Sequence, residues 1–453
     1  MLMTVSEIVK ACGGKLLCGD PKTQVTQVTT DSRQVEPGAL FVPIRGERVD
    51  AHLFIPATLE AGAAAVLTQE HTAMQDTHAW IAVEDTEKAL QALAKAYRAR
   101  FSIPIVGITG SVGKTTTKEM VALALSAGKR VMKTQGNQNS QIGVPLTMFQ
   151  LDETVEAAVV EMGMSQFGEM ARLADIVAPQ YAVMTNIGIS HIENLHTQEN
   201  ILREKAHILD KFGPDSAVVL NGEDQMLREL PAQLPYRAVL VGLHSTCDYY
   251  ARDLVMNEDG MDFVACCPGV RVPVHLPVFG EYQVINALSA LAMADLLHVD
   301  LRAAAARLSS YQPLAMRQQV YRFGGITLID DSYNASPDAM RGSVDVLCAY
   351  PGRHIAVLAD MLELGEFSHA AHVSCGEHAA KAGVDVLVTV GPQAAAIEEG
   401  AKHVAPDLSC RHFTENEPAA AYLESLLTPG DVVLVKGSRG MHMDEIVSKL
   451  LAL

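Results

Sequence analysis

The sequence predicts an α/β protein of three domains. Its 453 residues correspond to three domains of roughly 150 residues each. Continuous apolar segments, each followed by a helical segment, occur in two separate stretches, a pattern typical of parallel sheets covered by helices. A shorter N-terminal stretch mixes brief strands and helices. We expect a small N-terminal α/β domain over residues 1–101, a central doubly wound parallel sheet over 102–312 and a second open, mostly parallel sheet over 313–453.

The composition excludes several classes of protein. With 49% hydrophobic and 19% charged residues, the chain can bury complete cores, which excludes the disordered class. The net charge of −18 argues against binding to nucleic acid or anionic membranes, so a bound anion needs positive charge supplied locally. The sequence contains no run of about 18 apolar residues, so it predicts no membrane-spanning segment. The N-terminus resembles a helix, not a signal peptide, and the eight cysteines contain no CxxC pair, so we expect a cytoplasmic protein with reduced thiols.

The predicted elements of the N-terminal domain are short. Apolar and β-branched segments predict strands over 25–30, 39–44, 63–68 and 80–83. Apolar residues at helical spacing over 86–101 predict a helix that closes the domain.

The two larger domains are predicted from continuous apolar strands. The boundary between them lies within 309–318, where Pro313 ends a helix. We expect buried strands in the central domain over 103–109, 156–162, 181–187 and 216–221, and in the last domain over 326–331, 354–360, 384–391 and 431–437.

The segment GITGSVGKTT (107–116) carries the strongest functional signal. It lies between a predicted strand and a helix, where glycines let backbone N–H groups surround a phosphate chain and the helix N-terminus attracts negative charge. It is similar to a P-loop, although Ile108 occupies the position of the first glycine and the glycine stands at 107. The candidate nucleotide-binding residues are Gly107, Thr109, Gly110, Ser111, Gly113, Lys114, Thr115 and Thr116.

Two polar residues follow later strands of the same predicted sheet. Glu161 ends 156–162, and His191 lies in the loop after 181–187. The carboxyl ends of parallel strands line the ligand crevice of such a sheet, and Mg²⁺ prefers oxygen ligands such as a carboxylate and the Thr115 hydroxyl. The alternatives are a strand-end charge in solvent for Glu161 and a structural loop histidine for His191.

A second group of histidines lies on a predicted helix near the C-terminal sheet. His369, His372 and His378 occur within SHAAHVSCGEHAA. No carboxylate or cysteine pair nearby completes a tetrahedral zinc site, so we expect a solvated helix face.

Four segments together resemble the Mur ligases, the ATP-dependent enzymes that build the peptidoglycan stem peptide. They are TGSVGKTTTKEM, EMGM, NIGISHIENL and DDSYNASPDAM, and the resemblance covers essentially the whole chain in family order. It is closest to the last-acting member, which joins D-alanyl-D-alanine to UDP-N-acetylmuramoyl-tripeptide. The segments GNQNSQIGVPLTM, ADMLELGE and VLVKGSRGMHMDEIV support that member, and the DNPR motif of its nearest sibling is absent.

The resemblance implies a role for each domain. The N-terminal domain would bind the UDP end of the substrate, where Ser32 and Arg33 in TTDSRQV match the family's uridine-site segment. The central domain would bind ATP, and a C-terminal Rossmann-like domain would close over it. Asn137 and Asn139 match positions near the sugar and peptide path.

The resemblance also implies roles at the nucleotide and the metal. Asn286 matches an adenine-contacting asparagine, while Arg317 and Asp331 match groups that reach the nucleotide phosphate and ribose. Lys205 matches a lysine that is carbamoylated by CO₂. Mg²⁺ would then be held by Thr115, Glu161, His191 and Lys205, and the catalytic residues would be Lys114, His191 and Lys205.

The implied reaction is amide formation through an acyl phosphate. The substrate carboxylate takes the γ-phosphoryl group of ATP, and the amine of D-alanyl-D-alanine then displaces phosphate. We expect the protein to be a monomer that uses these two substrates together with ATP and Mg²⁺. We expect no nucleic-acid partner and no insertion into a membrane. The alternatives are another amino-acid ligase of the superfamily and a P-loop nucleotide-binding regulator without ligase chemistry.

Overall fold

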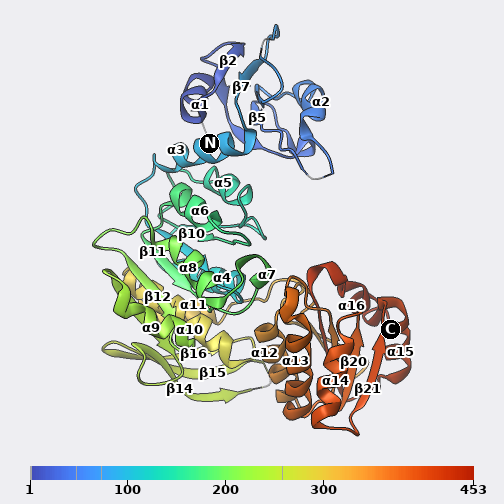
Figure 1. Ribbon diagram of the computed structural model, residues 1–453. Helices are drawn as coiled ribbons and strands as arrows, with labels where there is room; N and C mark the ends of the chain where they lie inside the picture. The colour runs from blue at the N-terminus through green and yellow to red at the C-terminus, as the bar shows by residue number, and fades with distance from the viewer. Residues whose placement is uncertain (1–2, 47, 73, 258) are drawn as a thin grey trace.

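The computed structural model describes residues 3–46, 48–72, 74–257 and 259–453. The chain forms three α/β domains with separate sheets, as the sequence predicts (Figure 1). The blue N-terminal domain lies at one end of the molecule, the green and yellow central domain in the middle, and the orange and red third domain beside the central one. Within the described part of the chain, no helix has the length and apolar character needed to cross a membrane.

The N-terminal domain contains a five-stranded sheet in the order β2-β7-β6-β5-β4 and a separate β1-β3 pair. The stretch 25–30, predicted as one strand, is divided between these two sheets. Val25 and Val28 are both buried, and because side chains alternate along a strand, residues three apart cannot share one face without a break. The elements are β1 (Met3–Thr4), α1 (Val5–Cys12), β2 (Lys15–Cys18), β3 (Gln24–Val25), β4 (Gln27–Thr29), β5 (Ala39–Phe41), α2 (Ile55–Glu60), β6 (Ala65–Thr68), β7 (Ala79–Ala82) and α3 (Thr86–Arg98).

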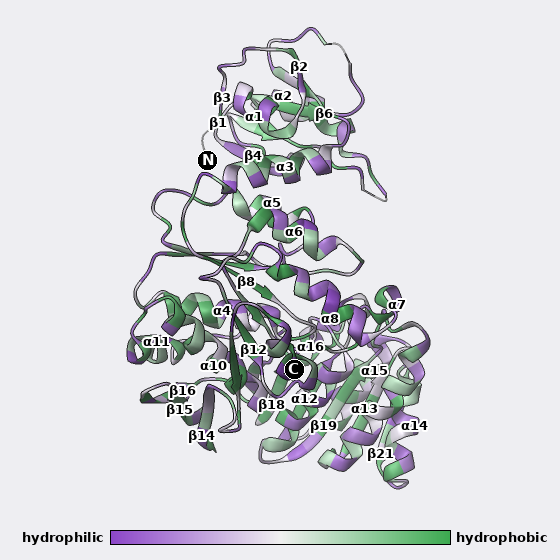
Figure 2. Cartoon of the chain, turned by 60° about the vertical axis from the view of Figure 1, so that its left-hand side comes forward, coloured by the Kyte–Doolittle hydropathy of each residue, from purple (hydrophilic) through white to green (hydrophobic). Residues whose placement is uncertain are grey.

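The central domain is built on a nine-stranded sheet in the order β16-β15-β14-β13-β12-β11-β8-β10-β9. The pairs from β9 to β14 are parallel, and the strands are mostly apolar because helices cover both faces (Figure 2). The parallel strands and their helices are β8 (Ile105–Thr109), α4 (Lys114–Leu125), β9 (Val131–Lys133), α5 (Gly143–Met148), β10 (Ala157–Glu161), α6 (Glu169–Val177), β11 (Tyr181–Met184), α7 (Ile192–Leu195), α8 (Gln198–Ala206), β12 (Ala217–Asn221), α9 (Gln225–Glu229), β13 (Arg237–Gly242), α10 (Glu281–Leu296) and α11 (Leu301–Leu308).

An antiparallel extension of this sheet was not predicted. Strands β14 (Tyr249–Met256), β15 (Met261–Cys267) and β16 (Val270–Leu276) pair in antiparallel fashion at one edge. In β16 the buried residues Val272, Val274 and Leu276 alternate with more exposed ones, which is the pattern of a strand with one solvated face.

The third domain has a six-stranded sheet in the order β17-β18-β22-β19-β20-β21. All its pairs are parallel except β17 with β18, so the prediction of a mostly parallel sheet is confirmed. The elements are β17 (Gln319–Phe323), β18 (Ile326–Asp330), α12 (Pro337–Ala349), β19 (Arg353–Ala359), α13 (Ser368–Ala382), β20 (Val386–Val390), α14 (Ala395–Val404), β21 (Ser409–Phe413), α15 (Asn416–Leu426), β22 (Asp431–Lys436) and α16 (Asp444–Leu450).

Helix α3 joins the N-terminal domain to the central domain. One hydrophobic cluster runs from the N-terminal sheet through α3 into the central domain. The Tyr97 hydroxyl donates to Leu151 O (2.7 Å), and Arg98 Nε donates to Val177 O (2.8 Å). The third domain has two further clusters, one of which also includes Phe279 of the central domain while the other lies within the third domain alone. The first two domains share the cluster around α3, which includes no described residue of the third domain.

Candidate active site

A cavity of about 920 Å³ lies between the central and third domains. The carboxyl ends of β8, β10 and β11 open into it from one side, and α12 and the linker before β17 line it from the other. Most of the residues predicted for nucleotide, metal and peptide binding line this cavity: Ser111, Gly113, Lys114, Thr115, Thr116, Asn137, Asn139, Glu161, His191, Asn286, Arg317 and Asp331.

The loop between β8 and α4 has the backbone that its glycines require. Gly110 has φ 147°, and a Cβ there would lie 1.9 Å from Thr185 Oγ1. Gly113 caps α4 with φ 83° and offers no side chain to the first N–H groups of the helix. These N–H groups and the helix dipole favour an anion at this end of α4. Asn186 Oδ1 accepts the N–H of Ser111 (3.0 Å) and of the next residue (2.8 Å), which holds the loop in place.

Two lysines meet at one backbone carbonyl of this loop. Lys114 Nζ donates to Gly110 O (2.8 Å) and to Ser111 O (3.3 Å), and Lys205 Nζ donates to the same Gly110 O (3.0 Å). Lys205 is 1% exposed. Burial lowers the pKa of both amines, and the neighbouring Lys114 lowers the pKa of Lys205 further, well below its ordinary value. The site therefore favours a neutral amine at Lys205.

Glu161 is held at the end of β10 by the P-loop helix and a neighbouring loop. Its Oε1 accepts from Thr115 Oγ1 (3.1 Å) and from Asn139 Nδ2 (2.7 Å). Its Oε2 is buried, has no hydrogen-bond partner, and lies 3.7 Å from Nζ of the fully buried Lys118. Lys118 also pairs with Glu119 (3.1 Å). This arrangement presents one carboxylate oxygen and the Thr115 hydroxyl to a hard cation.

The third domain contributes a second polar group to the cavity. Asp331 Oδ2 accepts from Lys436 Nζ (2.5 Å) and from Ser343 Oγ (2.6 Å). The Arg317 guanidinium stacks 3.9 Å from the ring centroid of Tyr333. These contacts fix a carboxylate and a guanidinium on the side of the cavity opposite the P-loop.

His191 connects the two sides. It precedes α7 with φ 63°, and its Nδ1 lies 2.6 Å from Oε2 of Glu363, which belongs to the third domain. The histidine lowers the pKa of the Glu363 carboxyl below its ordinary value. His191 is thus both a cavity residue and a contact between domains.

Some predicted residues lie away from the cavity lining. Gly107 and Thr109 belong to β8 below the loop. Ser32 and Arg33 lie in a short 3₁₀ helix of the N-terminal domain. Arg33 is largely exposed and forms two hydrogen bonds with Asp31 (2.9 and 2.8 Å), whose pKa falls to about 2 beside the guanidinium. Neither Ser32 nor Arg33 is among the described residues that line the cavity.

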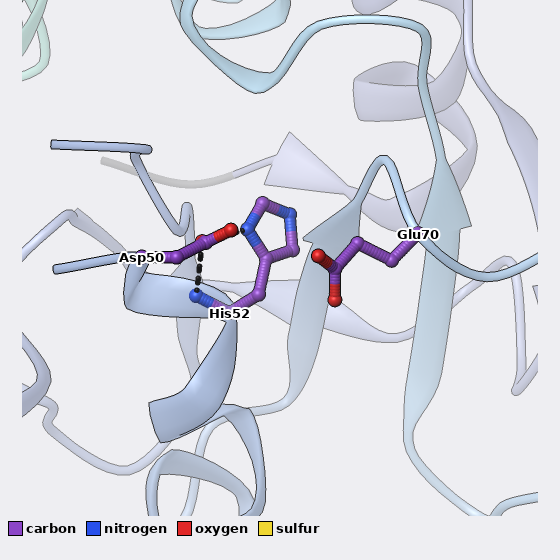
Figure 3. Close-up of side chains that lie close together, drawn as sticks. All are labelled: Asp50, His52 and Glu70. Carbon is purple, nitrogen blue, oxygen red and sulfur yellow. Dashed lines mark hydrogen bonds and ion pairs between the residues drawn. The ribbon is translucent and has the colours of Figure 1, made fainter. Parts of the chain in front are cut away.

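A His–carboxylate group that the sequence did not indicate lies in the N-terminal domain (Figure 3). Asp50, His52 and Glu70 bring possible ligand atoms within 4.8 Å of one another. Asp50 Oδ1 lies 2.6 Å from His52 Nδ1, and Arg45 pairs with both Asp50 (2.9 Å) and Glu70 (2.9 Å). Because one guanidinium pairs with both carboxylates, the group is explained as an ion-pair network that fixes the loop before α2.

The expectation of a solvated helix face for the three histidines of α13 is wrong for His372. It is fully buried; its Nε2 accepts from Met361 N (2.9 Å) and its Nδ1 donates to Ser368 O (2.7 Å). His369 and His378 pair with Glu399 and with Asp345, which lies on α12. His372 is therefore a core residue with both ring nitrogens satisfied.

Sequence reasoning missed several polar residues around the cavity. Asn186 is the penultimate residue of the predicted strand 181–187, and Lys436 is the penultimate residue of 431–437, so their positions at strand carboxyl ends could have identified them. Lys118 lies one turn after Lys114 on α4, and only its burial distinguishes it from a solvated lysine and indicates that it pairs with Glu161.

Comparison with known proteins agrees with this geometry. Residues 24–98 match the Mur ligase family, catalytic domain; residues 108–294 match the Mur ligase middle domain; and residues 316–439 match the Mur ligase, glutamate ligase domain. A UDP-N-acetylmuramoyl-tripeptide–D-alanyl-D-alanine ligase of Bacillus subtilis (strain 168) is 36% identical over 99% of this chain and 98% of its own length. The chain belongs to the Mur ligase family.

Other members of the Mur ligase family are similar over comparable lengths. The ligase of the same name from Escherichia coli (strain K12) is 32% identical, covering 99% of this chain and 98% of its own. A crystal structure of MurF from Acinetobacter baumannii superposes with a TM-score of 0.93 at 30% identity, covering 100% of this chain and 99% of the other. MurF from Thermotoga maritima in complex with ADP gives 0.84 at 29% identity, covering 94% and 97%.

Proposed function

We propose that this chain is the ligase that adds D-alanyl-D-alanine to UDP-N-acetylmuramoyl-tripeptide, with ATP converted to ADP and phosphate. The observation that carries the proposal is similarity over the whole length to ligases of that name. The cavity supports it, because P-loop residues and third-domain residues line one space in which two substrates and a nucleotide could meet. A P-loop nucleotide-binding regulator without ligase chemistry would not need third-domain residues to line this cavity. We propose that the enzyme is a cytoplasmic monomer, with domains divided near residues 101 and 312.

The proposed chemistry has two steps. An oxygen of the tripeptide carboxylate attacks the γ-phosphorus of ATP, the bond to the bridging oxygen breaks, and ADP leaves. The nitrogen of the deprotonated dipeptide amine then attacks the carbonyl carbon of the acyl phosphate, and phosphate leaves as the amide forms. The ammonium of the dipeptide loses its proton to a base before this attack.

The chain's own residues bind and orient the reacting groups. The α4 N-terminus and Lys114 would bind the phosphates, and Lys114 would move from its carbonyl contacts to the charge that develops in phosphoryl transfer. Arg317 and Asp331 would contact phosphate and ribose from the third domain, and Asn286 would contact the base. Asn137 and Asn139 would bound the peptide path, and Ser32 with Arg33 would bind the uridine end.

The residues around Glu161 fit Mg²⁺. The buried Glu161 Oε2 lacks a hydrogen-bond partner, and Thr115 supplies a second hard oxygen ligand beside it. We propose that Thr115, Glu161, His191 and a modified Lys205 hold the ion. When bound, it would supply charge neutralisation between the carboxylate and the triphosphate.

Lys205 fits the proposed carbamate. Its amine is buried beside Lys114, and its lowered pKa favours the neutral form that adds CO₂. In that reaction the amine nitrogen forms a bond to the carbon of CO₂ and loses one proton. The product is an anionic group, which would remove the repulsion between Lys205 and a nearby dication.

The test is a substrate-omission assay of ADP release. With ATP and Mg²⁺, we expect release only when UDP-N-acetylmuramoyl-tripeptide and D-alanyl-D-alanine are both present, together with formation of the pentapeptide. UDP-N-acetylmuramoyl-dipeptide with a free diamino acid should give none. Preference for this second pair would assign the chain to a sibling ligase, and ADP release that ignores both peptides would favour the regulator.

A further inference from the structure

A chain of buried side-chain hydrogen bonds connects the P-loop helix to the linker before the third domain. Thr117 Oγ1 on α4 donates to Asn286 Oδ1 (3.0 Å) on α10, and Asn286 Nδ2 donates to Gln283 Oε1 (3.2 Å). Gln283 Nε2 then donates to Gln318 Oε1 (3.1 Å) in the linker, and Gln318 Nε2 donates to the Tyr282 hydroxyl. Asn286, Gln283 and Gln318 are each 7% exposed or less.

One end of the chain lies against the nucleotide-binding loop. A Cβ on Gly113 would lie 3.5 Å from Asn286 Oδ1 and 3.7 Å from Nδ2, so this amide packs against the loop glycine. Asn286 also lines the cavity. A ligand that hydrogen-bonds the Asn286 amide would therefore engage the same group that donates to Gln283, and could alter that hydrogen bond.

The other end of the chain lies at a strained part of the linker. Gln318 has φ 55° and Met316 has φ 61°, so the residues on both sides of Arg317 adopt the left-handed conformation that side chains disfavour. Met316 O accepts from Tyr333 N (3.1 Å), and Arg317 stacks on the same tyrosine. Such strain persists only where surrounding contacts hold it. The Gln318 amide is one of these contacts.

The chain also reaches the third domain directly. Tyr282, which accepts from Gln318, packs against α12, since a Cβ on Gly342 would lie 3.2 Å from Tyr282 Cε1. A buried amide that loses its partner keeps its full desolvation cost, so the members of this chain favour one joint arrangement.

We propose that Gln283 and Gln318 are positioning residues that hold Arg317 toward the nucleotide and make its placement depend on Asn286. The buried chain would couple occupation of the nucleotide pocket to the conformation of the linker. The inference rests on the proposed function only where it concerns turnover, because its direct consequence is a change in nucleotide affinity.

The first test measures binding of a non-hydrolysable ATP analogue by calorimetry. Arg317→Ala should weaken binding about tenfold, the cost of a lost charge-assisted hydrogen bond. Gln318→Asn keeps an amide that tolerates the left-handed conformation but is one methylene too short to reach Gln283. It should weaken binding about fivefold, and the double variant should bind no more weakly than Arg317→Ala alone.

A second variant and a control keep the test decisive. Gln283→Asn breaks the same hydrogen bond from α10 and serves if Gln318→Asn does not fold. Ser289→Ala is the matched control, because Ser289 is buried on the same helix but donates only to Ile285 O. It should bind the analogue as wild type does.

Two results would overturn the proposal. The first is that Gln318→Asn weakens binding of the ATP analogue by the same factor in the wild type and in the Arg317→Ala variant. The second is that Gln318→Asn and Gln283→Asn both bind the analogue as tightly as the wild type does. In the ligation assay, the glutamine variants should raise the KM for ATP while the KM values for both peptides stay constant. A merely structural defect would instead reduce the active fraction and leave the KM for ATP unchanged. If the wild type does not ligate, the calorimetry still decides the inference.

Discussion

Replacement of Lys114 by methionine should abolish ligation without destabilising the fold. Methionine keeps the length of the stem and removes only the ammonium group. In the transition state that ammonium would face the charge that develops on the transferred phosphoryl group. Loss of one preorganised donor costs about 2.7–4 kcal/mol, or roughly 10²–10³-fold in kcat, and the loss of a full charge should reach at least that range.

The effect on stability follows from the contacts of Lys114. Its two hydrogen bonds go to carbonyls of its own loop, no carboxylate of the described residues forms an ion pair with it, and burial lowers its pKa. Because burial disfavours the charged ammonium, we expect the free energy of unfolding to stay constant or rise when that group is removed. Lys118, one turn along α4, is the matched contrast, because it is fully buried and paired with Glu119 and Glu161. Lys118→Met leaves the buried Glu161 carboxylate without its cation, although Glu119 keeps Lys133, and it should cost about 3–5 kcal/mol.

The assay pairs ADP release under saturating substrates with urea unfolding of both variants. We expect Lys114→Met to be inactive and stable, and Lys118→Met to be unstable. Activity of Lys114→Met within tenfold of wild type would refute the role of the lysine in phosphoryl transfer. Equal destabilisation in the two variants would refute the argument from their different partners.

Four further outcomes are expected. Lys205→Ala should lose activity and recover part of it with formate or acetate; near-normal activity without either would exclude the carbamate. Since the folded-state pKa of Lys205 lies below its unfolded value, the unfolded chain binds more protons between the two, so wild-type stability measured without CO₂ should rise with pH toward about 10.4, and the variant should lack this rise. Lys436→Met should lower the free energy of unfolding by about 3–5 kcal/mol by leaving Asp331 unpaired, and adding Asp331→Asn should restore part of it; additive losses would contradict the pair. Small-angle scattering should show a smaller radius of gyration with ATP analogue and tripeptide substrate, and an unchanged radius in an active preparation would exclude domain closure.

The sequence predicted those parts of the site that depend on strand order. Glu161 and the P-loop could be placed together because β8 and β10 are neighbouring parallel strands whose carboxyl ends meet. The assignment of Asn286, Arg317 and Asp331 to one cavity required the family resemblance, since they belong to elements far apart in the chain.

Features set by side-chain geometry over long distances were beyond sequence reasoning. The burial of His372 depends on the N–H of Met361, which no periodicity in α13 reveals. Glutamines 283 and 318 would each be assigned to solvent by composition, and only the packing of α10 against the linker makes them partners. The antiparallel edge of the central sheet was missed because a strand such as β16 alternates buried and exposed residues, unlike the continuous apolar strands used to recognise parallel sheets.

The core shared by the first two domains has a consequence for substrate choice. Because α3 and its hydrophobic cluster join these two domains, we expect the distance between the proposed uridine site at Arg33 and the P-loop at Lys114 to vary little. A nucleotide-linked peptide anchored at its uridine end would extend from that site across the first two domains toward the P-loop. A stem one residue too short would stop before the phosphate, and one residue too long would overrun it. The enzyme would thus measure the stem it extends by length as well as by chemistry.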